Sequence, residues 1–403
     1  MKLSEELLWR GFHAETTIKD PAELDNRASK KFYWGADPSA DSLTIGNLAA
    51  AMMCACFVRH GYEPYLLVGG ATGQIGDPKE NGERDLKSLD EVEHNKKCIA
   101  AQMKRIIQSP DLTQVDNYDW FKDMKYLEFL REVGKAFSMT QLLDRQFVQN
   151  RIGEGGSGIS YAEFSYTLIQ GYDFLHLHRK YGIDLQLCGA DQFGNCSSGI
   201  HLIKRLENAK ADAWSTPLII DPATGRKFGK SEGNAIWLDS KKTSIFDFYQ
   251  FWMNQPDDSV EYLMKIYTLL DKEAVDEIMA GHKKAPELRL AQKALAMGAT
   301  EVVHGKENME AVVNLTERLF SNDLDEVVEA EIEGFADYLA TAKKGTGLLD
   351  VLVETGLCSS KSEARKLAAA GAISVNGTKV KEDVKINQTA LVKRGKNKFA
   401  VVK

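Results

Sequence analysis

Two short apolar segments flank one long one between residues 31 and 69, and their order restricts the chain to few folds. Lys31–Ala36 predicts a strand, Ile45–Arg59 a helix and Pro64–Gly69 a second strand. A strand, a helix and a strand in this order form the unit of a parallel sheet, because parallel neighbours need a long crossover connection. The sequence therefore predicts an α/β body built on a parallel sheet.

The rest of the body continues this alternation, and the chain then changes character twice. The further elements expected in the body are a helix over 161–180, a strand at Asp184–Leu187, a helix over Asn195–Lys210 and a strand at Leu218–Ile220. Residues 244–320 predict one helix after another. Residues 348–403 predict two helices followed by short strands, with Asn376-Gly377 as a hairpin turn.

Charge is divided unevenly along the chain. The protein carries 51 Lys and Arg against 58 Asp and Glu, a net charge of −7. Residues 341–403 hold 13 basic and 5 acidic residues, so this tail has a net charge of +8 beside a body of −15. A basic module on an acidic body is the asymmetry expected of a protein that binds the phosphates of a nucleic acid.

Other features argue against a membrane protein or a disulfide-rich one. The longest apolar run, Leu48–Val58, has 11 residues, which is too few to span a bilayer. The N-terminus lacks the apolar core of a signal peptide. The six Cys residues contain no C-x-x-C pair, which argues against a zinc site or a disulfide framework. We therefore expect a cytoplasmic protein without a metal site of its own.

The segment Gly35–Asn47 follows the first predicted strand and opens the helix. Free N–H groups and the positive end of the helix dipole make such a helix start suitable for phosphate. Thr44 and Asn47 lie three residues apart in the first turn, and Gly46 permits the close approach of a flat base. Taken alone, such a segment is more often an N-capped helix after a tight turn.

A second segment, Lys227-Phe228-Gly229-Lys230-Ser231, places two lysines three residues apart in a Gly-containing loop. Such a loop can fold over a triphosphate and offset the charge that builds on it in the transition state. Lysines in loops are usually only solvated, so the pentapeptide alone does not decide between a triphosphate-binding loop and a solvated one.

Tyr166, Gln170 and Asp173 lie on one face of the predicted helix over 161–180, because they are spaced i, i+4 and i+7. A phenol, an amide and a carboxylate are more typical of a pocket wall than of a solvated face, which stays the alternative. The loops Gly73–Asp77 and Gly189–Asn195 follow predicted strands. Carboxyl ends of parallel strands share one edge of a sheet, where ligands bind, so we expect these polar segments to converge there.

In combination, these segments resemble a known family. Gly35–Asn47 and Lys227–Ser231 resemble the HIGH and KMSKS elements of class I aminoacyl-tRNA synthetases. Tyr33-x-Gly35-x-Asp37-Pro38, Tyr166-x-x-x-Gln170-x-x-Asp173 and Gly189-x-Asp191-Gln192-x-Gly194-Asn195 resemble the bacterial-type tyrosyl-tRNA synthetases. The tail resembles an S4-type RNA-binding domain in Gly356-Leu357, Ser362–Leu367 and Val375-Asn376-Gly377. The resemblance covers essentially the whole chain.

The resemblance implies a Rossmann-like catalytic domain, then an all-α domain and a small α+β S4-like domain. The expected boundaries are 1–220 for the catalytic domain, 221–245 for the KMSKS-type loop and connection, 246–330 for the helical tRNA-binding domain, 331–347 for a linker and 348–403 for the S4-like domain.

The resemblance also implies a ligase that activates L-tyrosine with ATP, accompanied by Mg²⁺, and transfers the tyrosyl group to tRNA(Tyr). The residues implied to bind tyrosine are Tyr33, Asp77, Tyr166, Gln170, Asp173 and Gln192. Those implied to bind ATP are Asp37, Ser39, Gly46, Asp191, Lys227 and Lys230, with Thr44, Asn47, Lys227, Lys230 and Ser231 in catalysis. Those implied to bind RNA are Arg365, Lys366, Lys379, Lys393 and Arg394. The family further implies a homodimer, formed near residues 120–170, and no membrane association.

The chain departs from the family at Thr44 and Asn47, where His is usual, so HIGH reads Thr-Ile-Gly-Asn. Both side chains can donate hydrogen bonds to phosphate, as His can. Trp34 also stands where the family often has a small residue. The altered motif keeps two alternatives open, a tryptophanyl-tRNA synthetase-like ligase and a non-catalytic RNA-binding paralogue. A further alternative is a nucleotidyltransferase of the same superfamily, which would lack the helical middle domain and the tail.

Overall fold

The computed structural model describes residues 1–76, 87–143, 146–153, 155–220, 228, 230–231, 234–320 and 329–403. The chain divides into two compact units. The first consists of Met1–Leu238 with Glu261–Leu269, and the second of Asp239–Val260 with Leu270–Lys403. No helix in the described ranges is both long and apolar enough to cross a membrane.

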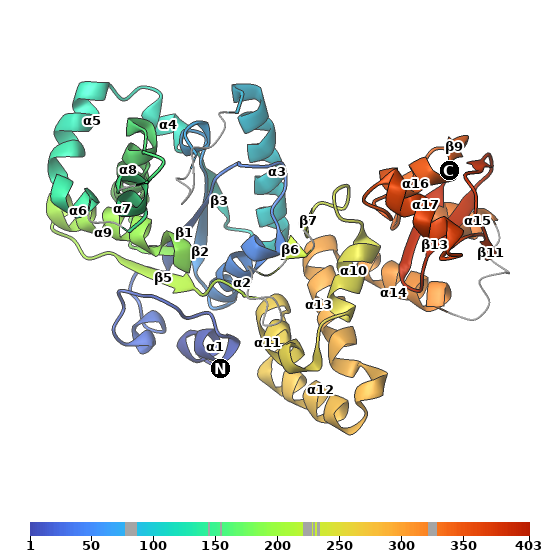
Figure 1. Ribbon diagram of the computed structural model, residues 1–403. Helices are drawn as coiled ribbons and strands as arrows, with labels where there is room; N and C mark the ends of the chain where they lie inside the picture. Colours follow the sequence, from blue (N-terminus) through green and yellow to red (C-terminus); the bar gives the residue numbers. More distant parts are fainter. Residues whose placement is uncertain are drawn as a thin grey trace. The chain divides into compact units, whose positions relative to one another are not determined.

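A parallel sheet of five strands forms the centre of the first unit (Figure 1). Its strands are β1 (Lys31–Ala36), β2 (Glu63–Val68), β3 (Thr113–Val115), β4 (Leu185–Gly189) and β5 (Asp212–Thr216). They lie in the order β3-β2-β1-β4-β5, and every neighbouring pair is parallel. The chain winds outward from β1 to β3 and then crosses to β4 on the other side of β1. This confirms the predicted Rossmann-like α/β fold and puts its topological switch point between β1 and β4.

Helices cover both faces of the sheet (Figure 1). Helices α2 (Ile45–Arg59) and α3 (Leu89–Ile107) pack on one face, and α8 (Tyr161–Tyr181) and α9 (Phe193–Glu207) on the other. Glycine allows α8 and α9 to pack closely, because a Cβ added at Gly199 would lie 2.6 Å from Phe174 Cβ. The shorter elements of this unit are α1 (Leu3–Arg10), η1 (Pro21–Leu24), η2 (Thr72–Gln74), α4 (Tyr118–Phe121), α5 (Tyr126–Glu132), η3 (Gly134–Ala136), α6 (Met139–Leu143), α7 (Gln146–Ile152), η4 (Ala190–Gln192), β6 (Lys230–Ser231) and β7 (Asn234–Ala235).

The last strand of the sheet corrects the sequence-based assignment. We expected it at Leu218–Ile220, but β5 covers Asp212–Thr216, all of it buried. The polar residues of β5 conceal a strand in the sequence, because a buried acidic residue is uncommon. Asp212 is accommodated by the Arg27 guanidinium, whose Nη1 lies 3.0 Å from Asp212 Oδ2.

Helices make up the first part of the second unit, as the sequence predicts. They are α10 (Ile245–Met253), α12 (Lys272–Lys284), η5 (Pro286–Leu288), α13 (Leu290–His304) and α14 (Lys306–Phe320). Helix α11 (Asp257–Tyr267) is divided between the two units, and its last turns pack in the first. There the Arg10 guanidinium donates hydrogen bonds of 2.7 and 3.0 Å to the carbonyls of Lys265 and Thr268.

The tail combines short helices with a mixed sheet. Its elements are α15 (Glu329–Phe335), β8 (Ala340–Ala342), β9 (Thr346–Gly347), α16 (Leu348–Glu354), α17 (Lys361–Ala369), β10 (Ile373–Val375), β11 (Thr378–Lys379), β12 (Lys385–Ile386), β13 (Ala390–Arg394) and β14 (Lys398–Val402). Asn376 and Gly377 have φ of 46° and 76°, as a two-residue hairpin turn requires. The segment 331–347, expected as a linker, contains β8, which pairs with β14, and β9, which pairs with β12.

Candidate functional site

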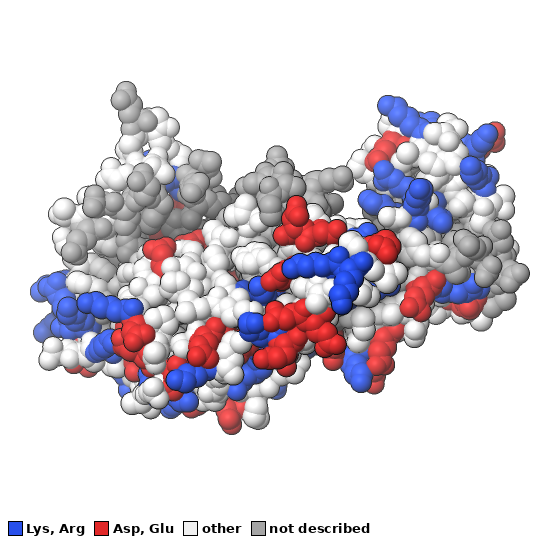
Figure 2. Space-filling view, turned by 90° about the horizontal axis from the view of Figure 1, so that it is seen from below, with Lys and Arg blue, Asp and Glu red and all other residues white. Residues whose placement is uncertain are grey.

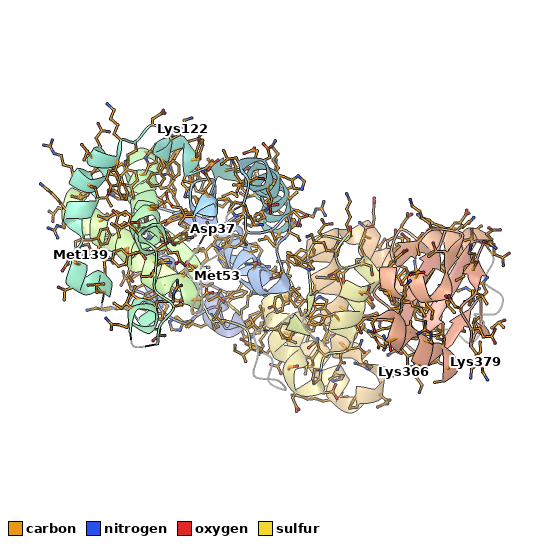
Figure 3. The ribbon with its side chains drawn as sticks, turned by 45° about the horizontal axis from the view of Figure 1, so that its top comes forward. Asp37, Met53, Lys122, Met139, Lys366 and Lys379 are labelled. Atoms are coloured by element: carbon orange, nitrogen blue, oxygen red, sulfur yellow. The ribbon has the colours of Figure 1, made fainter. Side chains whose placement is uncertain are left out.

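A cavity of about 560 Å³ opens at the carboxyl ends of the parallel strands, around the switch point between β1 and β4. It collects side chains from loops that are far apart in the sequence. The predicted site residues that line it are Tyr33, Asp37, Ser39, Thr44, Gly46, Asn47, Tyr166, Gln170, Asp173, Asp191 and Gln192. Figure 3 labels Asp37 in the interior of the first unit.

Consecutive residues of β1 divide the cavity wall between the two faces of the sheet. Tyr33 lies on the α8 side, where its ring centroid is 5.1 Å from that of Phe174. Trp34 therefore points to the α2 side, because side chains alternate along a strand. Both line the cavity. The face that carries Tyr33 is thus next to the α8 residues, and the face that carries Trp34 is next to the start of α2.

The α8 side of the cavity holds buried polar atoms that lack partners. Tyr33 Oη and Gln170 Oε1 are buried and have no hydrogen-bond partner among the described residues. Burial raises the pKa of the Tyr33 phenol well above its ordinary value. A buried polar atom without a partner is costly, so a ligand that supplies the missing hydrogen bonds is favoured here.

Asp173 lies on the same side and is 2% exposed. Asn117 Nδ2 donates to its Oδ2 at 3.1 Å, and Trp120 Nε1 donates to its Oδ1 at 3.0 Å. Burial raises the pKa of the Asp173 carboxyl well above its ordinary value, although both hydrogen bonds act in the opposite direction. Trp120 is held in turn by stacking on His176, at a centroid distance of 4.4 Å.

A hydrogen-bond network connects Asp173 with the loop after β1. Asn117 Nδ2 also donates to Thr72 Oγ1 at 3.2 Å, and Thr72 Oγ1 donates to Asp37 Oδ1 at 2.7 Å. Tyr166 Oη donates to Asp37 Oδ2 at 2.7 Å. Asp37, expected to bind ATP, therefore also orients Tyr166. Thr72, Asn117 and Trp120 were not predicted from the sequence, although the first two follow β2 and β3 at the edge where ligands bind.

The Gly-rich loop after β2 lies against these groups. A Cβ at Gly69 would lie 2.0 Å from Thr72 Oγ1, and a Cβ at Gly70 would lie 2.3 Å from Asp116 Oδ1. Gly70 N donates to Asp116 Oδ1 at 2.9 Å. A side chain at Gly69 would displace Thr72 and one at Gly70 would displace Asp116, which accounts for the Gly-Gly pair of this loop.

Thr44 and Asn47 lie together at the start of α2. Asn47 Oδ1 accepts hydrogen bonds from Thr44 N at 3.1 Å and from Thr44 Oγ1 at 3.0 Å. Gly46 lies between them, and among the described residues outside its chain neighbours and its own helix backbone only Thr44 Oγ1, at 3.5 Å, is within 4 Å of an added Cβ. A polar pair beside an open helix start is suited to an anionic or flat ligand.

Gln192, in the turn after β4, is held by Asn195 in the first turn of α9. Asn195 Nδ2 donates to Gln192 Oε1 at 3.1 Å, and Thr167 Oγ1 donates to Asn195 Oδ1 at 3.1 Å. Asp191 is exposed in the same turn. This loop thus offers polar groups to the cavity.

The lysine-containing segment is described only in part. Asp77 and Lys227 lie outside the described residues. Lys230 and Ser231 form β6, which pairs with β7, and nothing further is described of their side chains. The chain then returns to the start of α2, where Ile45 N donates to the Ile236 carbonyl at 3.1 Å. The second motif is therefore tied to the first by backbone pairing.

One group of possible metal ligands occurs in the described part of the chain, formed by Glu6, Cys56 and His60. Glu6 is already paired with Arg10 at 2.7 Å and with Arg59. Two guanidinium groups compensate its charge, so the group is a structural ion-pair cluster.

On the tail, Lys and Arg side chains gather on the surface (Figure 2). Arg365, Lys366 and Lys379 are exposed, and Figure 3 labels Lys366 and Lys379 at the edge of the tail. Lys393 lies over the Phe399 ring at 5.2 Å. Arg394 instead donates to Glu363 Oε1 at 2.8 Å and to the Leu357 carbonyl, so it joins β13 to α17.

Comparison with known proteins identifies the family. Residues 25–321 match the family of tRNA synthetases class I (W and Y), and residues 328–403 match the tyrosine–tRNA ligase SYY-like C-terminal domain. A tyrosine–tRNA ligase of Staphylococcus haemolyticus is 39% identical over 416 residues, which cover 99% of this chain and 98% of that protein. The chain belongs to the tyrosine–tRNA ligase family.

Further relatives agree with this membership. A tyrosine–tRNA ligase of Flavobacterium johnsoniae is 40% identical over 428 residues, with 100% of this chain and 99% of that protein covered. A C-terminally truncated mitochondrial tyrosyl-tRNA synthetase of Aspergillus nidulans has a TM-score of 0.70 at 30% identity, covering 79% of this chain and 94% of that one. A tryptophanyl-tRNA synthetase of Encephalitozoon cuniculi, at 14% identity and a TM-score of 0.57, shares the fold.

Proposed function

We propose that this enzyme is a tyrosine–tRNA ligase, which activates L-tyrosine with ATP and then esterifies the 3′ end of tRNA(Tyr). The observation that carries the proposal is one cavity in which the buried Tyr33 and Asp173 face the open start of α2. In the first step, the tyrosine carboxylate attacks the α-phosphate of ATP and releases pyrophosphate. In the second, the tyrosyl group passes from AMP to the terminal ribose of tRNA.

The α8 side would bind the amino acid. Tyr33 and Asp173 would contact the substrate phenol, and a phenol supplies the partner that Tyr33 Oη lacks among the described residues. Tyr166 and Gln170, together with Asp77, would hold the α-ammonium group. Gln192, which lines the same cavity, would lie near the carboxylate.

The α2 side would bind ATP. Thr44, Gly46 and Asn47 would contact the nucleotide at the helix start, with Ser39 and Asp37 in the preceding loop and Asp191 near the ribose. Lys227, Lys230 and Ser231 would stabilise the charge that develops on the phosphates. Mg²⁺ would arrive with ATP as part of the substrate. No protein nucleophile is required, since alignment and charge stabilisation suffice for both steps.

The tail would bind the RNA. Its net charge of +8 favours phosphate, and Arg365, Lys366 and Lys379 are exposed, with Lys393 partly so. Arg394 would contribute to RNA binding and also hold the tail together, because Glu363 and the Leu357 carbonyl accept hydrogen bonds from its guanidinium. The boundaries 1–220, 221–245, 246–330, 331–347 and 348–403 would then separate activation from RNA binding, with 331–347 contributing to the tail sheet.

A homodimer would form through the apolar surface of α5 to α8. Its exposed side chains are Tyr126, Leu127, Met139, Ile152 and Tyr161. Leu127 is 75% exposed, and Met139 lies at the outer edge of the first unit (Figure 3). An apolar surface of this kind on one side of a protein is typical of an interface. A reducing cytoplasm would suit the enzyme, because its six Cys residues are free thiols.

Tyrosine-dependent exchange between ATP and labelled pyrophosphate tests the proposal. We expect exchange with tyrosine, little with tryptophan and none without an amino acid, followed by esterification of tRNA(Tyr). Exchange with tryptophan alone would favour the tryptophanyl alternative. An inactive protein that binds tRNA would favour the non-catalytic paralogue. Pyrophosphate exchange without an amino acid would favour a nucleotidyltransferase.

A further inference from the structure

Helix α3 presents two amide side chains to the loop that joins β1 to α2. Asn95 Nδ2 donates to the Pro38 carbonyl at 3.0 Å. Gln102 Oε1 accepts from Leu43 N at 2.8 Å, and Gln102 Nε2 donates to Ser42 Oγ at 3.1 Å. The two amides thus hold both ends of the loop, and we call Asn95 and Gln102 the α3 clamp.

The clamp does more than pack the helix. Asn95 and Gln102 are seven residues apart, so they lie on one face of α3. Val92, Ile99 and Met103 already bury that helix against the body. Asn95 is 3% exposed, and burying an amide is unfavourable unless it makes hydrogen bonds. The amides therefore provide hydrogen-bond partners for the loop, because the Pro38 and Leu43 backbone groups lie outside any strand or helix.

The clamped loop carries the groups on which both halves of the cavity depend. Asp37 begins it and orients Tyr166, and Thr44 follows it as the first polar group of α2. The residue beside Asn95 holds a second loop, because Lys96 pairs with Asp116, which accepts a hydrogen bond from Gly70 N. One helix therefore sets the positions of the loops after β1 and β2 relative to each other.

We propose that Asn95 and Gln102 are positioning residues for amino-acid activation, which align the loop 37–44 and the start of α2 with the reacting groups. This inference rests on the proposed function. Neither side chain lines the cavity, so neither touches substrate. The clamp acts on the alignment of ATP with the tyrosine carboxylate, and misalignment by about 1 Å lowers a rate by up to about a hundredfold.

Three variants of the full-length enzyme test the clamp. Gln102→Met keeps the length of the side chain but loses both hydrogen bonds. We expect kcat for tyrosine-dependent pyrophosphate exchange to fall about tenfold or more, with the KM for tyrosine nearly unchanged. Gln102→Glu keeps an acceptor for Leu43 N and should recover most of the rate. Lys104→Met, on the exposed side of the same helix, should match the wild type.

Hydrogen exchange of the loop gives a second readout. In Gln102→Met, amides between residues 37 and 47 should exchange faster than in the wild type, and Asn95→Leu should reproduce both the kinetic and the exchange effect. A Gln102→Met enzyme with unchanged kcat but a lower Tm would overturn the clamp and leave a purely structural role. An inactive wild type would overturn the proposed function, and the inference with it.

Discussion

The indole N–H of Trp120 donates a hydrogen bond of 3.0 Å to Oδ1 of Asp173, while Asn117 donates to Oδ2. Both oxygens of this buried carboxylate are therefore fixed before any ligand arrives. A carboxylate held in this way presents its remaining lone pairs in fixed directions, which is how a site can require a hydroxyl group. Under the proposed function, Asp173 and Tyr33 would together make the cavity specific for a phenol.

Replacing Asp173 by Ala should weaken the preference for tyrosine over phenylalanine. In the wild type, phenylalanine leaves Tyr33 and Asp173 without the phenol, and an unsatisfied buried group costs about 1–3 kcal/mol. The ratio of kcat/KM for the two amino acids should therefore fall at least about tenfold in Asp173→Ala. Pyrophosphate exchange with each amino acid measures it.

Trp120→Phe is the matched variant for this test. It keeps an aromatic ring to stack on His176 but loses the hydrogen bond to Asp173. We expect a smaller fall in the same ratio, since Asn117 still holds the other oxygen. If the ratio is unchanged in both variants, the assignment of the phenol pocket is wrong.

The affinity for tyrosine should depend on pH through Asp173. Burial raises the pKa of this carboxyl above its ordinary value of 3.8, so the native state holds the proton more tightly than the unfolded chain. Its contribution to the unfolding free energy is present below that ordinary value and is lost as pH rises through the raised pKa. The ionised carboxylate is the better acceptor for a phenol, so tyrosine should bind more tightly as pH rises through the raised pKa.

Equilibrium dialysis of tyrosine over a pH series that starts near the ordinary carboxyl pKa and rises from there checks this, with Asp173→Asn as the control. The neutral amide does not ionise, so the variant should bind more weakly and with a flatter pH profile. Parallel profiles for the two proteins would assign the pH dependence to another group.

Substituting the exposed lysines of the tail should weaken RNA binding and spare activation. Lys366→Ala combined with Lys379→Ala should raise the KM for tRNA(Tyr) and reduce the slope of log K against log salt by about 2, about one per lost phosphate contact. Lys361, like Lys366, lies in α17, but it pairs with Asp350 at 2.5 Å. Lys361→Ala should therefore weaken RNA binding less. A salt dependence equal to that of the wild type would exclude both lysines from the RNA surface.

The elements around the site were predictable where local pattern and tertiary structure agree. Lys31–Ala36 and Ile45–Arg59 have the predicted bounds, because an apolar run and a helix start coincide with their ends. β5 was misplaced because Asp212, Ser215 and Thr216 are polar and yet buried. Their burial depends on partners far away in the sequence, such as Arg27, which no local pattern reveals.

The site residues also fall into those that were predictable from the sequence and those that were not. Tyr166, Gln170 and Asp173 were predictable because they share one helix face and line one cavity. Thr72, Asn117 and Trp120 were not, because their role depends on hydrogen bonds between loops after three different strands. The side chain of Arg394 resembles an RNA-binding group in the sequence, but its ion pair with Glu363 is visible only in the structure.

Charge introduced at Leu127 should prevent association of two chains. Leu127 is 75% exposed on α5, beside the exposed Tyr126 and near Tyr161, whose hydroxyl lies 3.4 Å from that of Tyr126. Burying a glutamate in an apolar interface is unfavourable, so Leu127→Glu should sediment as a monomer when the wild type sediments as a dimer. Leu8→Glu, at another exposed leucine of the same unit, is the control. A wild type that is monomeric at micromolar concentration would refute the proposed interface.

A methyl group at Gly199 should disturb the proposed tyrosine-binding side of the cavity through Phe174, which packs against Tyr33. The added Cβ would lie 2.6 Å from Phe174 Cβ and 2.8 Å from Phe174 Cδ1, and Phe174 is fully buried. Overpacking of this kind costs about 1–3 kcal/mol. Since the Phe174 ring packs against Tyr33, Gly199→Ala should lower the Tm and raise the KM for tyrosine more than that for ATP.

Gly194→Ala is the control for stability, because no other described atom outside the adjoining residues and the backbone of the same helix lies within 4 Å of the added Cβ at this position. Alanine is the better helix former, so this variant should be at least as stable as the wild type. The two glycines thus separate the effect of contact from that of helix propensity. If Gly199→Ala were as stable as Gly194→Ala and bound tyrosine normally, the contact of α9 with Phe174 would have no part in shaping the pocket.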